Sequence, residues 1–418
     1  MTHMPMTTIK IGYVPLSDSS PLIAAKELGL FNKHGINVEL HRLNSWATVR
    51  DKVSLGLLDG AQMLAPLPLA MTLGLEPISM DMTTAFSMGL NGNGITFSNT
   101  LFDDIQSLGY DKQASHQELG HVLREHIQQR QLAGKPPLTM AIVHPYSMHN
   151  YLLRYWLQSV SIDIDQDINL IVVPPPQMVS EMQLGRIDAY CVGEPWNSLA
   201  EYKQVGKVVL SGRQIWNNAP DKVFAVTRQW AQSHPEIHKQ LLKALLEAAI
   251  WCDSGANRAS LIRMLSGADY LNLPEEVLAV ALQPADNPDN AMILQNNLIF
   301  YRHAANYPWS SHAIWSLTQM IHSGQWQKNN INEAELTDIA RQVYASHIYR
   351  EVAMSMQLPV PTIISKAEGM HIQPWLLENA TDPILLGADC FIDGVQFDPE
   401  KPFNYLKRLN KTATADSI

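Results

Sequence analysis

The segment VVPPPQMVSEMQLGRIDAYCVGEPWN, Val172 to Asn197, contains the sharpest structural signals in the sequence. Three consecutive prolines end an apolar strand, a helix is predicted from Gln177 to Leu184, and Gly185 is a suitable residue to end that helix. The apolar run IDAYCVG then predicts a second strand, which is followed by the turn GEPW that begins at Gly193. A strand, a helix and a strand joined by short connections are typical of a mostly parallel sheet.

The same alternation begins close to the N-terminus and predicts an α/β fold. IKIGYVP, INVELH and DGAQMLAP are predicted strands, and SDSSPLIAAKELGLF and ATVRDKVSLGLL are the predicted helices between them. Ser20 is expected to cap the first helix, Pro21 suits its first turn, and Gly29 is expected to end it. A second α/β run begins after Asn99, and a long amphipathic helix is predicted around Ile237 to Cys252. Because 418 residues exceed one ordinary core, we expect two α/β lobes.

Composition restricts the class of protein. Hydrophobic residues make up 46% of the sequence and charged residues 17%, which is typical of a globular protein. The formal net charge of −10 argues against a nucleic-acid surface as the main activity. No apolar run reaches the roughly 18 residues needed to span a bilayer. The start MTHMPMTTIKIGYVP shows neither the pattern of an export signal nor a cysteine for a lipid. The three cysteines are widely spaced, which suits a reducing compartment. We therefore expect a cytoplasmic protein.

Motifs that would indicate an enzyme or a cofactor site are missing from the sequence. It contains no phosphate-binding loop, no His-Glu-x-x-His, no Cys-x-x-Cys pair and no Gly-x-Ser-x-Gly elbow. GLNGNG, from Gly89 to Gly94, lacks the spacing of a dinucleotide fingerprint. His116 and His121 are five residues apart and do not share one helical face, which disfavours a metal site there. We therefore expect no enzymatic activity, no cofactor and no metal.

The turn after the predicted strand Ile187 to Gly193 is a candidate for a ligand contact. Ligands of open α/β sheets lie beyond the carboxyl ends of the strands, and pockets favour the interfaces between domains. Gly193 stands at such an end and is able to offer a backbone amide to a cleft. An ordinary strand-to-helix turn has the same pattern, so the residues alone leave both interpretations open.

Several segments together resemble the nitrate- and bicarbonate-binding proteins of ABC transporters. They are IGYVPLSDSSPLIAAKELGLF, SWATVRDKVSLGLLDGAQMLAPLPLAMTLG, NGNGI, MHNYLLRYWL, IVVPPPQMV, DAYCVGEPWN and PDKVFAVTRQWAQSHPE, with YPWSSHAIWSLTQM, IYREVA and DGVQFDP nearer the C-terminus. The resemblance implies a two-lobed periplasmic-binding-protein fold of type II topology with a helical C-terminal extension. It implies that residues 8–98 form the first part of the first lobe and that the chain crosses near Asn99 into a second lobe of residues 99–221. The chain would return near Lys222, so that residues 222–418 form the second part of the first lobe and the C-terminal helical region.

The resemblance also implies a site for a small planar anion. Nitrate carries one negative charge over three oxygens in one plane, so a selective site needs a cation and several donors. Lys222 would be the cation, Trp46 would offer its indole N–H or its ring face, Gly193 its backbone N–H, and His149 a ring nitrogen. Without the resemblance, Lys222 would be read as a surface lysine, Trp46 as packing and His149 as a helix-face histidine.

Asn93 is the position where the sequence departs from the family pattern. Transporter relatives tend to carry glutamine in this NG-x-G motif, and asparagine keeps the amide on a shorter side chain. Whether Asn93 contacts the ligand directly is therefore left open. Ser45 and Gln177 are expected to supply further donors behind the direct contacts.

Two branches of the family differ in their cellular location. Transport components carry an export signal and usually a lipid-attachment cysteine, and this sequence shows neither. It therefore resembles most the cytosolic nitrate/nitrite sensor of the NasS type, which pairs with an RNA-binding antiterminator of the NasT type and releases it when the anion binds. The alternatives are a nitrate- or bicarbonate-binding subunit of an ABC transporter and a cleft enzyme on the same fold, as in thiamine-precursor synthesis. The sequence does not separate nitrate, nitrite and bicarbonate as ligands.

Overall fold

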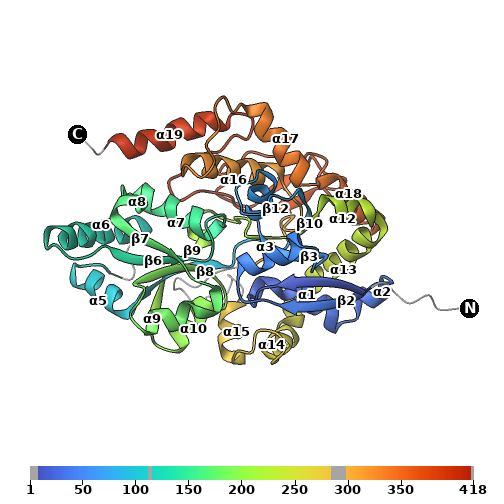
Figure 1. Ribbon diagram of the computed structural model, residues 1–418, viewed down its shortest axis with the longest axis horizontal. Helices are drawn as coiled ribbons and strands as arrows, with labels where there is room; N and C mark the ends of the chain where they lie inside the picture. Colours follow the sequence, from blue (N-terminus) through green and yellow to red (C-terminus); the bar gives the residue numbers. More distant parts are fainter. Residues whose placement is uncertain (1–7, 112–114, 284–297, 416–418) are drawn as a thin grey trace, which may run out of the picture.

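The computed structural model describes residues 8–111, 115–283 and 298–415, and its core is two five-stranded sheets that lie side by side (Figure 1). The strand order is β2-β1-β3-β10-β4 in the first sheet and β7-β6-β8-β5-β9 in the second. The first sheet contains β1 (Thr8–Tyr13), β2 (Asn37–Arg42), β3 (Gly60–Leu64), β4 (Met82–Ser87) and β10 (Lys222–Thr227). The second contains β5 (Asn93–Ser98), β6 (Leu138–Ile142), β7 (Ile168–Val172), β8 (Ala189–Gly193) and β9 (Gly206–Ser211).

The two sheets share one topology. In each, three neighbouring strands are parallel, and a strand from elsewhere in the chain is inserted antiparallel beside them: β10 between β3 and β4, and β5 between β8 and β9. Because β5 already belongs to the second sheet, the chain changes sheets between Ser87 and Asn93, earlier than the predicted crossing near Asn99. The return falls between Ser211 and Lys222, close to the predicted position. We use first lobe and second lobe for these sheets with their helices.

Helices connect the strands in both lobes. The first lobe contains α1 (Ser20–Glu27), α2 (Leu30–Lys33), α3 (Trp46–Ser54), α4 (Leu67–Thr72), α12 (Arg228–Ser233), α13 (Pro235–Asp253), α14 (Arg258–Ser266) and α15 (Glu275–Ala281), with the 3-10 turns η1 (Ser17–Ser19) and η3 (Gly255–Asn257). The second lobe contains α5 (Asn99–Ser107), α6 (His116–Leu132), α7 (Met148–Ser159), α8 (Ile164–Asp167), the 3-10 turn η2 (Pro175–Gln177), α9 (Met178–Gln183), α10 (Trp196–Tyr202) and α11 (Gly212–Ile215). None of the described helices is long and apolar enough to cross a bilayer.

The proline- and glycine-bounded segment folds nearly as its sequence predicts. The second and third prolines of the run begin η2, α9 follows, and Gly185 ends the helix with a φ of +66°, where a side chain would be strained. The next strand is shorter than predicted and begins at Ala189. At the N-terminus, Gly29 also takes a positive φ, of +69°, but α1 starts one residue early, so Ser19 and not Ser20 occupies the cap position. The Ser20 hydroxyl donates instead to the Ser17 carbonyl.

The C-terminal region packs on both lobes. It contains α16 (Ser310–His322), α17 (Glu333–Val343), α18 (Ser346–Ser355), α19 (Pro402–Ala415) and the two-stranded pair β11 (Trp375–Leu377) and β12 (Ile384–Leu386). Helices α17 and α18 contact the first lobe at α4 and β4, whereas α16 and α19 contact α7 of the second lobe (Figure 1). The Tyr155 hydroxyl of α7 donates to Asp393 at 2.9 Å, which strengthens this second attachment.

Trp216, between α11 and β10, anchors the C-terminal region in the hydrophobic core. Its side chain is fully buried, and its ring centroid lies 4.8 Å from that of Trp315 and 4.7 Å from that of Phe391. Trp315 lies on α16, so three aromatic rings from distant parts of the sequence form one cluster, in which Phe391 stacks on both tryptophans.

We expect Trp216→Ala to lower the free energy of unfolding by about 3–5 kcal/mol, because it leaves a large cavity between the second lobe and the C-terminal region. Urea denaturation followed by circular dichroism measures this change. Tyr202→Ala is the control, since that ring is 56% exposed and its removal should change stability by less than about 0.5 kcal/mol. Equal stabilities of the two variants would contradict the anchoring role.

Candidate functional site

Four of the predicted site residues lie at strand or helix ends that meet between the two sheets. Gly193 is the last residue of β8, and Trp46 is the first residue of α3. Lys222 begins β10 and pairs with Leu64, the last residue of β3, because β10 runs antiparallel. Asn93 begins β5 and pairs with Gly193 for the same reason. The inserted strands therefore bring their first residues to the carboxyl ends of the parallel strands, where α/β sheets bind ligands.

These residues, together with His149 in the first turn of α7, form one buried cluster. Lys222, His149, Asn93 and Trp46 are each at most 1% exposed. The Lys222 ammonium lies 5.6 Å from the centroid of the Trp46 ring, within the range of a cation–π interaction. A Cβ atom added to Gly193 would lie only 3.6 Å from His149 Nε2, so the glycine backbone directly faces the imidazole.

Two carboxylates that we did not predict complete the cluster. Asp18 of η1 places Oδ2 3.0 Å from the Lys222 ammonium, and Asp221 also contacts that ammonium. His149 Nε2 lies 3.8 Å from Asp221 Oδ2, and Gln62 donates a hydrogen bond to Asp18 Oδ1. The signal that points to Asp18 is its position in the sequence, just past the carboxyl end of the first predicted strand.

Burial dominates the protonation states in this cluster. It raises the pKa of Asp18 to about 6, although the charge of Lys222 opposes that shift, and it also raises the pKa of Asp221. Burial alone would lower the pKa of Lys222, but Asp18 and Asp221 together outweigh it and the pKa is raised. Burial and the Lys222 charge hold the pKa of His149 well below its usual value. At neutral pH the lysine is thus charged and the imidazole neutral.

Several polar atoms of the cluster have unused hydrogen-bonding capacity. Among the described residues, the Trp46 indole N–H and both ring nitrogens of His149 have no hydrogen-bond partner. Buried polar groups are almost always satisfied in folded proteins, so such a concentration needs an explanation. A small polar ligand held between the indole, the imidazole and the ammonium would satisfy them.

Ser45 and Gln177 have other positions. Ser45 caps α3, since its Oγ accepts a hydrogen bond from the Thr48 amide at 3.2 Å, and it thereby fixes the turn that presents Trp46. Gln177 is exposed at the start of α9, and the structure does not bring its side chain to the buried cluster. His116, considered for a metal site, is hydrogen-bonded through Nε2 to Gln214 at 2.8 Å. In the described part of the chain, no group of three His, Cys, Asp or Glu side chains is arranged to hold a metal ion.

The site is closed by direct contacts between the lobes. The Ser17 amide donates to the Glu194 carbonyl at 2.7 Å, and the Trp196 indole donates to the Pro15 carbonyl at 3.2 Å. A Cβ on Gly193 would lie 3.2 Å from Leu16 Cδ2, so the turn after β8 packs tightly on the segment after β1. The cluster is therefore enclosed by both lobes.

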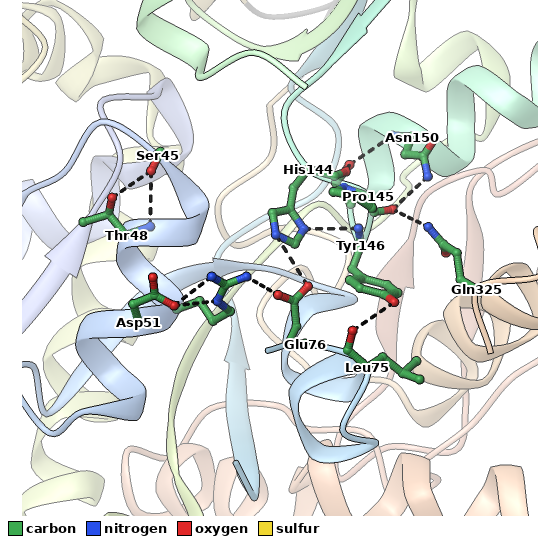
Figure 2. Close-up of polar contacts among 12 residues, drawn as sticks. Ser45, Thr48, Asp51, Leu75, Glu76, His144, Pro145, Tyr146, Asn150 and Gln325 are labelled. Atoms are coloured by element: carbon green, nitrogen blue, oxygen red, sulfur yellow. Dashed lines mark hydrogen bonds and ion pairs between the residues drawn. The ribbon is translucent and has the colours of Figure 1, made fainter. Parts of the chain in front are cut away.

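A second polar cluster, the rim cluster of Arg50, Glu76 and His144, joins the lobes. Figure 2 shows Glu76 facing His144. Glu76 of the first lobe receives the Arg50 guanidinium on one oxygen, and its other oxygen lies 3.6 Å from His144 Nε2 of the second lobe. The Tyr146 hydroxyl donates to the Leu75 carbonyl at 3.3 Å nearby. Arg50 lies one turn after Trp46 on α3, so the rim cluster holds the same helix that carries the site tryptophan.

We expect Glu76→Gln to lower the free energy of unfolding by about 1–3 kcal/mol, because the Arg50 guanidinium, 12% exposed, loses its buried carboxylate. Urea denaturation at pH 7 measures the change. Glu39→Gln is the matched control: Glu39 also faces a histidine, at 3.3 Å, but its side chain is 55% exposed. A loss as large for Glu39→Gln as for Glu76→Gln would show that the rim cluster has no special role.

Comparisons with known proteins show what the chain is similar to in sequence and fold. The model of the NMT1-like family matches residues 2–266. The nitrate/nitrite binding protein NrtA of Nostoc is 30% identical over 411 residues, which cover 96% of this chain and 86% of NrtA. The nitrate import ATP-binding protein NrtC of Synechocystis is 36% identical over 411 residues, but the chain spans only 55% of its length.

A solved structure shares the whole fold. The crystal structure of the periplasmic nitrate-binding protein NrtA from Synechocystis has a TM-score of 0.82 and 28% identity, with 97% of this chain and 98% of that one covered. This confirms the predicted two-lobed periplasmic-binding-protein fold of type II topology. The matched NrtA proteins are binding proteins, in line with the expectation that this chain is not an enzyme. The chain belongs to the NMT1-like family, within the group of ABC-type substrate-binding proteins that includes NrtA.

Proposed function

We propose that the chain binds nitrate or nitrite in the buried cluster around Lys222. The observation that carries this proposal is a buried ammonium beside unsatisfied donors of Trp46 and His149, enclosed between two lobes. The resemblance to nitrate-binding NrtA in sequence and fold supports the choice of ligand. Bicarbonate is the competing ligand, because bicarbonate-binding relatives match at similar identity.

The chemistry of the cluster suits a planar monovalent anion. Lys222 supplies the charge as a compact ammonium, and the Trp46 indole, the Gly193 amide and a neutral His149 supply donors from both lobes. His149 is held in the neutral form, so it donates from one ring nitrogen only. Asn93 packs closely on Gly212, since a Cβ there would fall 2.2 Å from Asn93 Oδ1, and we propose that it shapes the wall of the site.

In this proposal, binding of the anion closes the two lobes. Donors from both lobes converge on the anion, so the closed form binds it better than an open form and the ligand shifts the population towards closure. We propose that the chain acts in the cytoplasm as a sensor, and that closure releases an RNA-binding antiterminator. The similarity to the nitrate import ATP-binding protein NrtC supports this proposal, because a related chain forms part of a protein named for ATP binding.

A substrate-binding subunit of an ABC transporter is the second candidate. The match to periplasmic NrtA over 97% of the chain favours it. The two functions predict different partners. A pull-down from the source cells should recover an RNA-binding protein that added nitrate elutes, whereas recovery of transporter membrane subunits would favour the transport function.

Ligand identity is tested by calorimetry with nitrate, nitrite, bicarbonate and sulfate. We expect nitrate, and nitrite as well, to bind with micromolar dissociation constants, which correspond to about −8 kcal/mol. Sulfate should bind weakly, because its second charge would meet two carboxylates. Tight binding of bicarbonate without any heat from nitrate would contradict the proposal.

Lys222→Ala tests the site itself. Loss of a buried charge partner costs about 2–5 kcal/mol, so nitrate affinity should fall roughly 30-fold to several thousand-fold. The variant should also melt at a lower temperature than wild type at pH 8, because Asp18 and Asp221 lose their shared cation. Since both carboxyl groups take up protons as the pH falls, this deficit should shrink at pH 5.

Lys207→Ala is the control for this experiment. Lys207 lies on β9, is partly exposed and has no place in the cluster, so its removal should leave the affinity and the melting temperature unchanged. Wild-type nitrate affinity in Lys222→Ala would mean that the ligand binds elsewhere.

A further inference from the structure

The buried cluster contains more acidic than basic groups, which is unfavourable for binding an anion. Lys222 is 1% exposed, and the carboxyl groups that contact it, Asp18 and Asp221, are 3% and 2% exposed. If both carboxyl groups are ionised, the three groups sum to one negative charge before any ligand enters. A bound monovalent anion would double that charge inside a volume closed to water, where unpaired charges are very costly.

We propose that each monovalent anion enters this site together with one proton, which is taken from water and held on the carboxyl pair of Asp18 and Asp221. This inference rests on the proposed function and concerns how the same site is regulated. The step is balanced: a carboxylate, a proton and an anion become a carboxylic acid beside a bound anion. The protonated carboxyl group then becomes a donor to the anion instead of a repelling charge.

Asp18 is the better acceptor of the two. Its Oδ1 accepts a hydrogen bond from Gln62, while its Oδ2 faces Lys222 and lies near Gly193, where an added Cβ would be 3.5 Å away. A proton on Oδ2 would therefore point towards the second lobe and the proposed anion. Burial has already raised the pKa of Asp18 to about 6, and a neighbouring anion would raise it further.

The other titratable groups around Asp18 are poor alternatives. His149 and the Cys191 thiol face the cluster from the second lobe, but burial lowers the pKa of His149 and raises that of Cys191, so both stay neutral near pH 7. Glu194 follows β8, and its carboxylate accepts hydrogen bonds from the amide and hydroxyl of Ser198, at 3.1 and 2.9 Å. Lys222 keeps its proton throughout this range, since its pKa is raised.

Calorimetry with nitrate from pH 6 to pH 9, in buffers of different ionisation enthalpy, tests the inference on the wild-type protein. We expect the dissociation constant to rise by up to about tenfold per pH unit above pH 7, with close to one proton taken up per nitrate at pH 8. A dissociation constant that does not change with pH, with no proton uptake, would overturn the inference and leave the proposed function intact. No nitrate binding at any pH would instead overturn the proposed function.

Asp18→Asn identifies the acceptor. An amide resembles the protonated acid, so this variant should lose the pH dependence and bind nitrate at least tenfold more tightly than wild type at pH 8. Glu368→Gln is the matched control: Glu368 is 1% exposed and paired with Lys366, but it lies in the C-terminal region. It should keep the wild-type pH dependence. A folded Asp18→Asn variant with the wild-type pH dependence would overturn the assignment to Asp18.

Discussion

The rest of the structure depends on one constraint: the charge of a single buried lysine must be balanced by two carboxyl groups. Lys222 has almost no contact with water, so its charge must be balanced within the protein, and Asp18 and Asp221 provide that balance. Removing Lys222 leaves two buried carboxyl groups without a cation, whereas removing one carboxyl group leaves a balanced ion pair. The cluster also joins the lobes: Lys222 and Asp18 belong to the first lobe, and His149 faces Asp221 from the second. The same residues therefore balance the buried charge and join the two lobes.

The inserted strands explain how distant residues reach this lysine. A strand added antiparallel to a parallel sheet begins where its neighbours end, so the first residues of β10 and β5 arrive at the carboxyl ends of β3 and β8. Lys222 and Asn93 lie at those two positions. The crossings between the lobes thus bring candidate site residues together as well as connecting the sheets, so the candidate site lies beside the segments that cross between the lobes.

Much of the fold follows from local sequence signals, because strands, helix ends and glycine turns are fixed by neighbouring residues. Gly29 and Gly185 take the left-handed conformations that their positions predict. The observed crossing lies before the predicted one near Asn99, because the sequence of NGITF does not show that its antiparallel partners are β8 and β9 of the second sheet. Asp18 and Asp221 were missed for another reason. An acid beside an anion site is unfavourable in isolation, and its role becomes understandable only once the shared lysine and the complete burial are seen.

The C-terminal region and the rim cluster also connect the two lobes, outside the candidate site. The rim cluster ties α3, which carries Trp46, to the segment that leads into α7, which carries His149. The same α7 contacts α16 and α19, and the first lobe contacts α17 and α18. An opening movement must therefore either carry the C-terminal helices with one lobe or break their contacts with the other. If they move with the first lobe, the contact of α16 and α19 with α7 changes; if they move with the second lobe, the contact of α17 and α18 with α4 and β4 changes. In the proposed function, the loss of the anion from a buried lysine would therefore alter one of these two surfaces of the C-terminal region.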